Sequence, residues 1–262
     1  MAERWSVVIP FFNEADYLAD TIASLGAQQL RPDRLLLIDN ASTDGSAEVA
    51  RAAAERAGLA ATHLHEPRPG KIHALETAMA HLDTPLVALT DADTLYPPHY
   101  LALATRLLEQ PGVVAAMAIG VDDAPDAPAA RRWRWWRGRV MPALLPRQTH
   151  TGGYGQSFRT DALRAAGGFS EAQWGYVLLD HEIMQRVLKL GRAVYHPDLW
   201  CQPSPRRADR RRVRWTLGER LLYHATPFAL KDWYFYRFLG PRLARRRLTH
   251  LNLREKSWLD DA

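Results

Sequence analysis

The sequence predicts an α/β fold in which a mostly parallel sheet is covered by helices on both faces. Through about residue 120, short apolar runs alternate with segments whose apolar residues recur at helical spacing. This order of elements favours parallel strands that are joined by helical crossovers. Three of the apolar runs are followed by polar or turn-forming residues, at 10–14, 39–44 and 91–93. Because ligands bind at the carboxyl ends of parallel strands, we expect these three ends to form one site.

The predicted strands are short runs, rich in β-branched residues or leucine, that stop at a polar or turn-forming residue. The run at 7–9 stops at Pro10, for example, and the run from Leu86 stops at Asp91. In chain order, the predicted strands cover residues 7–9, 35–38, 60–65, 86–90 and 113–121.

Helices are expected between these strands, because apolar residues recur there every three or four positions. An alanine-rich helix ends near Arg56, and Ser42 or Thr43 is expected to cap its start. In chain order, further helices are expected around 18–25, 72–82, 98–109 and 179–190, and the C-terminal part predicts amphipathic helices.

Length and composition limit the kind of protein that this chain can be. The chain has 262 residues, of which 47% are hydrophobic, enough to bury a sizeable core. Its single cysteine, Cys201, excludes an intramolecular disulfide and fits the reducing cytoplasm. No secretory signal is visible, and no apolar run approaches the roughly 18–20 residues that span a bilayer. We therefore expect a cytoplasmic protein.

Charge is distributed unevenly along the chain. Residues 1–120 carry 8 basic and 15 acidic side chains, whereas residues 121–262 carry 26 basic and 14 acidic ones. The acidic first half argues against nucleic acid as a partner. The basic second half is suited to phosphates or to an anionic membrane surface.

Asp91 and Asp93 lie one residue apart at the end of a predicted strand. Two carboxylates placed in this way can face a divalent cation and the phosphates that it carries. The alternative is an ordinary polar turn in which an aspartate caps the next helix. The polar residues that follow the first two strands favour the cation site, because core packing does not require acids at the same end of each strand.

Five short stretches match a known family in the family's order. They lie at 7–14, 38–45, 70–75, 90–93, and 167–169 followed by 179–182. On these residues, the chain from its start to about residue 200 resembles the family 2 glycosyltransferases, which have the nucleotide-sugar-binding α/β fold called GT-A. The resemblance implies an enzyme that transfers a sugar from a nucleoside-diphosphate sugar, with UDP favoured over GDP as the carrier.

The resemblance also implies roles for the residues at the strand ends. Pro10 and Phe12 would border the nucleobase, with Phe12 as an aromatic face. Glu14 would accept hydrogen bonds from the ribose hydroxyls, and Asp39 would accept one from the base NH. Simpler alternatives remain open for two of them, since Pro10 could merely end a strand and Glu14 could sit in the first turn of a helix.

For the diphosphate, the resemblance implies Lys71 as a point charge, although Lys71 could also be a solvated surface residue. Asp91 would face the ribose or the surroundings of the metal. Asp93 would bind Mg²⁺ or Mn²⁺ directly. Diphosphate oxygens and water would complete the coordination, because the protein supplies few of the ligands.

The glycine-rich stretch at 152–159 occupies the position where the family lines the donor sugar and the acceptor. A glycine such as Gly153 lets the backbone approach a ligand closely, and Gln156 is a polar candidate in the same stretch. The glycine spacing fits neither the dinucleotide-binding pattern nor the P-loop pattern.

The helix that begins near Leu179 carries the candidate general base. The family pattern is Glu-Asp, with the Asp as the base; here Leu179 replaces the Glu, and Asp180 aligns with the Asp by its distance from Gly191. We expect Asp180 to take a proton from an acceptor hydroxyl in a single displacement that inverts the anomeric centre. Glu182, on another face of the helix, is the alternative base and a candidate near the donor sugar or acceptor. Asp180 could also cap the helix, a role that could coexist with catalysis.

Arginine and tryptophan gather in the second half. Residues 131–139 hold five Arg and three Trp, and residues 206–214 hold six Arg. Such segments suit the headgroup layer of an anionic membrane, so we expect peripheral contact with the inner face of the cytoplasmic membrane. The acceptor would then be a lipid-linked or cell-envelope glycan. The alternatives are a packed helix with solvated arginines or a loop over the acceptor, and Arg206 could close over the diphosphate.

The chain is therefore expected to have three parts. Residues 1–120 would form the nucleotide-sugar-binding half, residues 121–200 the acceptor-binding and catalytic half of the same domain, and residues 201–262 a basic, aromatic helical extension. Two other functions compete with glycosyl transfer: a sugar-phosphate nucleotidyltransferase and a nucleic-acid-binding module. The first would need a glycine-rich, basic loop after the first strand, where residues 11–14 are aromatic and acidic.

Overall fold

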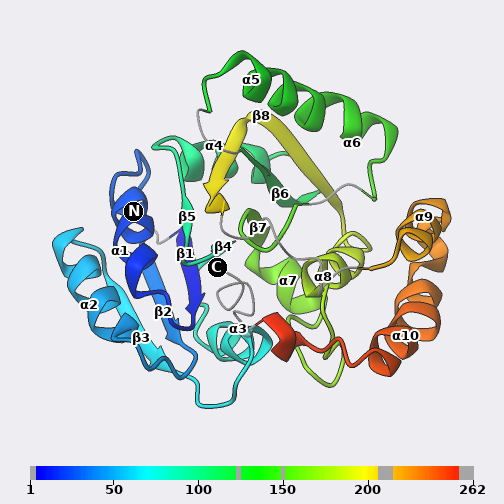
Figure 1. Ribbon diagram of the computed structural model, residues 1–262. Helices are drawn as coiled ribbons and strands as arrows, with labels where there is room; N and C mark the ends of the chain where they lie inside the picture. Colours follow the sequence, from blue (N-terminus) through cyan, green and yellow to red (C-terminus); the bar gives the residue numbers. More distant parts are fainter. Residues whose placement is uncertain (1–3, 122–124, 149–150, 206–214, 254–262) are drawn as a thin grey trace.

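The architecture comes from a computed structural model that describes residues 4–121, 125–148, 151–205 and 215–253. These residues form one mixed sheet with helices on both faces (Figure 1). The strand order is β3-β2-β1-β4-β7-β6-β8-β5. Pairing is parallel between β1 and β2, β1 and β4, β2 and β3, and β6 and β8, whereas β7 runs antiparallel to β4 and β6, and β5 to β8. The predicted α/β fold with a mostly parallel sheet is confirmed.

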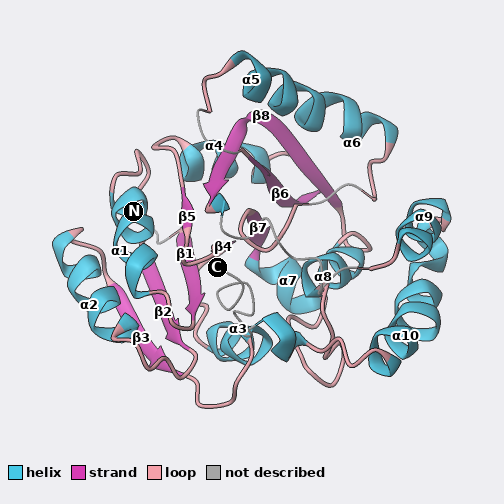
Figure 2. Ribbon diagram, viewed as in Figure 1, coloured by secondary structure: helices cyan, strands magenta, loops and turns pink. Residues whose placement is uncertain are grey.

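All five predicted strands are present, as β1, β2, β3, β4 and β6 (Figure 2). The strands are β1 (Trp5–Phe11), β2 (Arg34–Asp39), β3 (Ala61–His65), β4 (Leu86–Leu89), β5 (Thr94–Leu95), β6 (Val113–Gly120), β7 (Gln156–Arg159) and β8 (Arg192–Pro203). The helices are α1 (Ala15–Gly26), α2 (Ser46–Arg56), α3 (Lys71–Ala80), α4 (Tyr100–Leu108), α5 (Pro128–Trp135), η1 (Trp136–Val140), α6 (Met141–Leu144), α7 (Thr160–Ala165), α8 (Leu179–Val187), α9 (Leu217–Ala225), η4 (Phe228–Leu230), η5 (Trp233–Leu239), α10 (Gly240–Arg245) and η6 (His250–Leu253).

Alternate residues of the central strands face two separate hydrophobic cores. On β1, Val8 belongs to one core, whereas Val7 and Ile9 belong to the other. Helices α3, α7, α8 and the C-terminal helices contribute to the core around Val8, and α1, α2 and α4 to the opposite core. Every residue of β1 is buried. Burial on both faces explains why the strands are continuous apolar runs without polar alternation.

The start of α2 differs from the prediction. Gly45 precedes the helix in a left-handed conformation, with φ at 84°, and Ser46 is the first helical residue. The Ser42 hydroxyl accepts a hydrogen bond from the Asn13 backbone nitrogen at 3.1 Å, and the Thr43 backbone nitrogen donates to the Asn13 side chain at 2.8 Å. The expected cap by Ser42 or Thr43 is therefore wrong, because these residues join the loop after β2 to the loop after β1.

Strand β7 lies between β4 and β6, although its short sequence does not predict a strand. It runs antiparallel to β4, and the register pairs Leu89, the last residue of β4, with Gln156, the first residue of β7. An antiparallel strand begins where its neighbour ends. Gln156 is therefore delivered to the same edge of the sheet as the carboxyl end of β4.

The C-terminal helices pack on the core through aromatic side chains. Tyr223 of α9 and Tyr234 and Phe235 of η5 are buried, whereas Trp233 of η5 is exposed. The predicted arginine-rich stretch at 206–214 lies outside the described residues. Within the described ranges, no helix combines the length and the apolar character needed to cross a membrane.

A buried ion pair joins α8 to the C-terminal helices. Both carboxylate oxygens of Glu182 accept hydrogen bonds from the Arg186 guanidinium, at 2.7 Å each. The Tyr236 hydroxyl of η5 donates to the same carboxylate. Arg186 also donates to the carbonyl of Gly168, at 2.8 Å. An enclosed carboxylate is tolerated only with such donors, so this pair fixes the position of α8.

Replacing Arg186 with leucine would leave the Glu182 carboxylate buried without its cation. We expect the free energy of unfolding to fall by about 3–5 kcal/mol, the usual cost of breaking a buried ion pair. Urea denaturation followed by circular dichroism measures this loss. Arg56→Leu, at an exposed position of α2, is the matched control and should change the free energy by about 0.5 kcal/mol or less. A loss as small as that of the control would contradict the prediction.

Candidate active site

The ends of β1, β2 and β4 lie side by side at one edge of the sheet. Parallel register pairs Phe11, the last residue of β1, with Asp39, the last residue of β2. On the other side of β1, Val8 pairs with Leu89, where β4 ends. The polar segments that follow these strands therefore meet at one edge, which is where ligands bind in sheets of this kind.

Asp39, Phe12 and Glu14 line the part of this edge that β1 and β2 provide. Asp39 Oδ1 accepts a hydrogen bond from the Ser42 backbone nitrogen at 2.9 Å, and its Oδ2 lies 3.2 Å from Nδ1 of His65 on β3. Phe12 and Glu14 are half-buried in the loop after β1. Glu14 immediately precedes α1, but its side chain does not cap that helix.

Asn40 fixes the loop that connects β3 to α3. Its side-chain nitrogen donates to the carbonyls of Glu66 and Arg68, at 3.1 and 2.7 Å, and its side-chain oxygen accepts from the Gly70 backbone nitrogen at 2.7 Å. Asn40 is buried. Sequence reasoning missed this residue, and the available signal was its position directly after a predicted strand. Its hydrogen bonds set the point at which α3 begins.

Glu66 anchors the same loop with its charge. Its carboxylate accepts two hydrogen bonds from the Arg68 guanidinium, at 2.9 Å each, and one from the Thr77 hydroxyl of α3, at 2.5 Å. Hydrogen bonds from the Arg68 side chain lower the pKa of Glu66 from 4.5 to about 2. Burial acts in the opposite direction, and the hydrogen bond from Thr77 lowers the pKa further. The carboxylate is therefore ionised and tied to α3 at neutral pH.

Lys71, Asp91 and Gly153 come together from three different elements. Lys71 is the first residue of α3, and its ammonium group donates to the Asp91 carboxylate. A Cβ atom placed on Gly153 would lie 3.2 Å from Nζ of Lys71, so the glycine-rich segment passes directly against the lysine. Asp91 and Asp93 are each only 5% exposed. The Lys71 ammonium group, the Asp91 carboxylate and the backbone at Gly153 thus share one location, and Asp93 follows two residues after Asp91.

A small pocket lies at this location. Four of the predicted site residues, Pro10, Lys71, Gly153 and Gln156, contribute to its wall. The full lining consists of Pro10, Lys71, Leu75, Leu89, Thr90, Gly153, Gln156, Phe169 and Leu179. The pocket therefore joins the ends of β1 and β4 to the glycine-rich segment and to the start of α8.

Asp180 lies next to the pocket wall. The Gln156 side-chain amide donates to the backbone carbonyl of Asp180 at 3.2 Å, and the neighbouring Leu179 lines the pocket. The Asp180 side chain is 22% exposed, and its Oδ1 lies 3.1 Å from both the backbone nitrogen and Nδ1 of His181. Helix α8 is preceded by Leu178 and has no side-chain cap. The alternative in which Asp180 caps this helix is therefore wrong.

The pocket lining does not include seven of the described candidates: Phe12, Glu14, Asp39, Asp91, Asp93, Asp180 and Glu182. Glu182, the alternative base, points into the core, where Arg186 and Tyr236 hold its carboxylate. This placement favours Asp180 as the group that meets an acceptor. Arg206, the candidate for a diphosphate contact, lies outside the described residues.

The donor atoms at the end of β4 fit a hard divalent cation. Asp91 and Asp93 offer carboxylate oxygens, which Mg²⁺ and Mn²⁺ prefer over nitrogen and sulfur ligands. Lys71 already contacts Asp91, so Asp93 is the better candidate for a direct metal ligand. The near-complete burial of both side chains means that a cation here would interact with them strongly.

The sequence profile described as Glycosyl transferase family 2 matches residues 6–166. The chain belongs to glycosyl transferase family 2. The matched segment runs from β1 through α7, so it contains the strand ends, Lys71 and the glycine-rich segment. Helix α8, with Asp180, follows this segment.

Curated relatives of this family 2 chain include undecaprenyl-phosphate 4-deoxy-4-formamido-L-arabinose transferases. The protein from Edwardsiella ictaluri is 33% identical over 155 residues, which cover 55% of this chain and 44% of the relative. The protein from Pseudomonas aeruginosa is 32% identical over 151 residues, which cover 55% of this chain and 42% of the relative. The chain therefore spans less than half the length of the curated relatives that it matches.

Solved structures of glycosyltransferases share the fold of this family 2 chain. The mannosyltransferase PcManGT from Pyrobaculum calidifontis, in complex with GDP-Man and Mn²⁺, has a TM-score of 0.69 at 24% identity and covers 93% of this chain and 72% of that chain. S. aureus TarS in complex with UDP-GlcNAc has a TM-score of 0.62 at 14% identity and covers 90% of this chain and 71% of that chain. At these identities the likeness shows the fold, which is the GT-A fold.

Protonation of Glu66 should loosen the loop that leads to Lys71. Because the folded protein lowers the pKa of Glu66 from 4.5 to about 2, the ionised carboxylate stabilises the fold above pH 4.5, and this contribution is lost as the pH falls from 4.5 toward 2. The melting temperature of the native chain should therefore fall more steeply over this range than that of Glu66→Gln, which should be the less stable of the two at neutral pH. Thermal melts at several pH values measure the difference, and a difference that does not change with pH would contradict the prediction.

Proposed function

We propose that this chain is a metal-dependent, inverting glycosyltransferase that moves a sugar from a nucleoside-diphosphate sugar to a hydroxyl of a lipid-linked or cell-envelope glycan. The observation that carries the proposal is the convergence of Lys71, Asp91, Gly153 and the start of α8 at one pocket. Membership in glycosyl transferase family 2 favours glycosyl transfer over nucleotidyl transfer. The relatives named as undecaprenyl-phosphate sugar transferases support a lipid-linked acceptor.

In this proposal, the loop after β1 and the end of β2 bind the nucleoside. Pro10 and Phe12 border the base, Glu14 accepts hydrogen bonds from the ribose hydroxyls, and Asp39 accepts one from the base NH. The pairing of Phe11 with Asp39 at the ends of β1 and β2 supports this assignment. UDP is the favoured carrier and GDP the second candidate; the structures that share the fold contain UDP-GlcNAc and GDP-Man, respectively.

The diphosphate would lie between the start of α3 and the turn after β4. Lys71 contacts its oxygens as a compact positive charge, and Asp91 holds the ammonium group in place. Asp91 also faces the ribose or the surroundings of the metal, and Asp93 holds Mg²⁺ or Mn²⁺. When bound, the cation neutralises charge on the departing nucleoside diphosphate.

Asp180 is the proposed general base. It accepts the proton of the acceptor hydroxyl as the hydroxyl oxygen attacks the anomeric carbon, and attack from the face opposite the diphosphate inverts that centre. Burial above all, with a smaller effect of the Asp180 charge, raises the pKa of Tyr154 and Tyr223. Both phenols therefore stay protonated at neutral pH, and neither competes with Asp180 as the base.

Asp180→Asn should lower kcat by about 10²–10⁴-fold, because an amide cannot take the acceptor proton. Donor binding should be unchanged; it is measured as the rise in melting temperature with UDP- or GDP-sugars and Mn²⁺. Asp161→Asn, at an exposed position of α7, is the matched control and should keep full activity.

Near-normal transfer to a hydroxyl acceptor by Asp180→Asn would eliminate this residue as the base. An acceptor phosphate is ionised at neutral pH and needs no base. Near-normal transfer by Asp180→Asn to a lipid phosphate alone would therefore reassign the acceptor from a hydroxyl to a phosphate.

The membrane contact in this proposal is assigned to the helical segment α5–η1–α6, which lies along one margin of the molecule beside β8 (Figure 1). Trp135 and Trp136 are 59% and 40% exposed, and Arg132 is exposed beside them. Trp133 stacks on Trp136 with ring centroids 5.5 Å apart and donates to the carbonyl of Gly120. Exposed indole rings next to guanidinium groups are suited to the headgroup layer of an anionic membrane.

The double variant Trp135→Ser, Trp136→Ser should show severalfold less co-sedimentation with anionic vesicles, because two interfacial rings are removed. Leu190→Ser, at an exposed position beyond α8, is the matched control and should bind as the native chain does. Equal binding of the native chain to neutral and anionic vesicles at low salt would argue against this assignment.

A further inference from the structure

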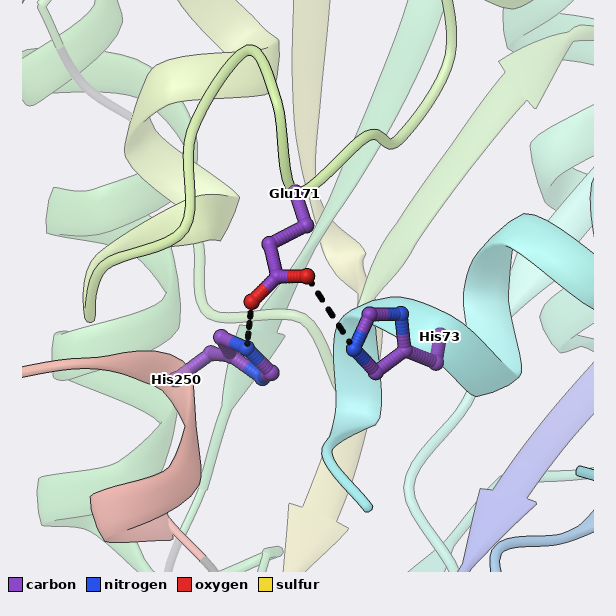
Figure 3. A group of neighbouring side chains, drawn as sticks. All are labelled: His73, Glu171 and His250. Carbon is purple, nitrogen blue, oxygen red and sulfur yellow. Dashed lines mark hydrogen bonds and ion pairs between the residues drawn. The ribbon is translucent and has the colours of Figure 1, made fainter. Parts of the chain in front are cut away.

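Three side chains from distant parts of the chain meet beside the start of α3 (Figure 3). His73 is on α3, Glu171 is in the segment between α7 and α8, and His250 is the first residue of η6. Glu171 lies between the two rings: its Oε1 is 3.0 Å from Nε2 of His250, and its Oε2 is 3.4 Å from Nε2 of His73. All three ligand atoms lie within 4.8 Å of one another.

We propose that His73, Glu171 and His250 form a Zn²⁺ site that fastens η6 to α3. Two imidazoles and one carboxylate are a ligand set typical of zinc. The set differs from the candidate cation site at Asp91 and Asp93, which offers carboxylate oxygens and suits Mg²⁺ or Mn²⁺. Zn²⁺ should therefore prefer the histidine site, and Mg²⁺ or Mn²⁺ the carboxylate site.

Two of the three ligand-atom separations are close to those of a zinc site, and the third is within 4.8 Å. Zinc bonds to nitrogen and oxygen are about 2.0–2.1 Å long, so neighbouring ligand atoms in a tetrahedral site lie roughly 3.3 Å apart. The separations of Glu171 from His250 and His73, 3.0 and 3.4 Å, are within a few tenths of an ångström of this value. The Glu171 side chain is 53% exposed, so it is able to rotate, and water can reach the remaining coordination position.

Glu76 orients two of the three ligands. Its Oε2 lies 3.3 Å from Nδ1 of His73, and its Oε1 accepts a hydrogen bond from the Glu171 backbone nitrogen at 2.9 Å. Histidines that bind metals usually donate their other ring nitrogen to a carboxylate, which fixes the tautomer and the ring orientation. This contact leaves Nε2 of His73 as the coordinating atom, and Nε2 is the atom that faces Glu171.

The burial of His250 supports a ligand role for its Nε2. The ring is 1% exposed, and its Nδ1 has no hydrogen-bond partner among the residues that the structure describes. A buried polar atom without a partner is destabilising, so a position used for packing alone favours an apolar side chain. The polar contact that the structure provides for this ring is at Nε2, toward Glu171.

A metal at this position would also support the candidate active site. His250 packs so closely on Gly70 that a Cβ atom on that glycine would lie 2.2 Å from Nδ1 of the ring. Gly70 directly precedes Lys71, whose ammonium group contacts Asp91. A zinc ion that holds η6 against α3 would therefore hold the turn that places Lys71. The proposed site acts as a clamp and takes no part in sugar transfer.

The test is to titrate Zn²⁺ into the metal-free full chain by calorimetry and to follow the melting temperature. We expect one tightly bound Zn²⁺ per chain and a higher melting temperature, because the ion binds the folded state. Glu171→Gln, at a half-exposed position, should weaken zinc binding by at least about tenfold, and Glu76→Gln by about 10–100-fold. Mg²⁺ should not compete, because imidazole nitrogens are poor ligands for it.

Asp93→Asn is the matched control, because it alters the other candidate metal site and should bind Zn²⁺ as the native chain does. Co²⁺ in place of Zn²⁺ should give the visible absorption of a tetrahedral site, and Glu171→Gln should lose it. The proposal is overturned if the native chain binds no stoichiometric Zn²⁺, if Glu171→Gln binds it equally well, or if Asp93→Asn abolishes binding. These readouts do not depend on transferase activity, so their failure leaves the proposed function untouched.

Discussion

Asn40 is buried at the end of β2, where its side chain holds the loop that leads to α3. Its nitrogen donates to two carbonyls in the segment 66–68, and its oxygen accepts from the Gly70 backbone nitrogen. Without these bonds, buried backbone groups would lose their partners, at a cost of about 1–3 kcal/mol each. The position of Lys71, and with it the contact to Asp91, depends on these bonds together with those of Glu66.

Carboxylates outnumber cationic side chains at the strand ends, which suits the cation of the proposed function. Asp39 ends β2 and Asp93 follows β4, the strands on either side of β1, and Asp180 lies beside the pocket wall. Lys71 is the cationic side chain of the described pocket lining, and Asp91 already offsets it. A diphosphate would add further negative charge in a partly buried place, where repulsion is weakly screened. In the proposed function, a divalent metal at Asp93 would offset this repulsion.

The sequence predicts an element correctly where its local apolar pattern and its surroundings in the fold favour the same structure. β1 and β2 are continuous apolar runs because both faces of the sheet are covered, so their residues alone indicate strands. β7 is mostly polar in sequence and β8 contains Pro197, so both become strands through pairing with distant partners. The strand ends were predictable for the same reason as the strands. The role of Asn40 was not, because it depends on hydrogen bonds to residues about thirty positions away.

The antiparallel insertion of β7 has a consequence for how such enzymes diversify. β1, β2 and β4 reach the pocket edge with their last residues, whereas β7 reaches it with its first, Gln156. The segment that precedes β7 therefore opens onto the pocket from outside the parallel core. Insertions or exchanges in that segment leave the turns after β1 and β2 intact. In the proposed function, donor and acceptor would thus be recognised by separate segments, so that one specificity could change while the other is inherited.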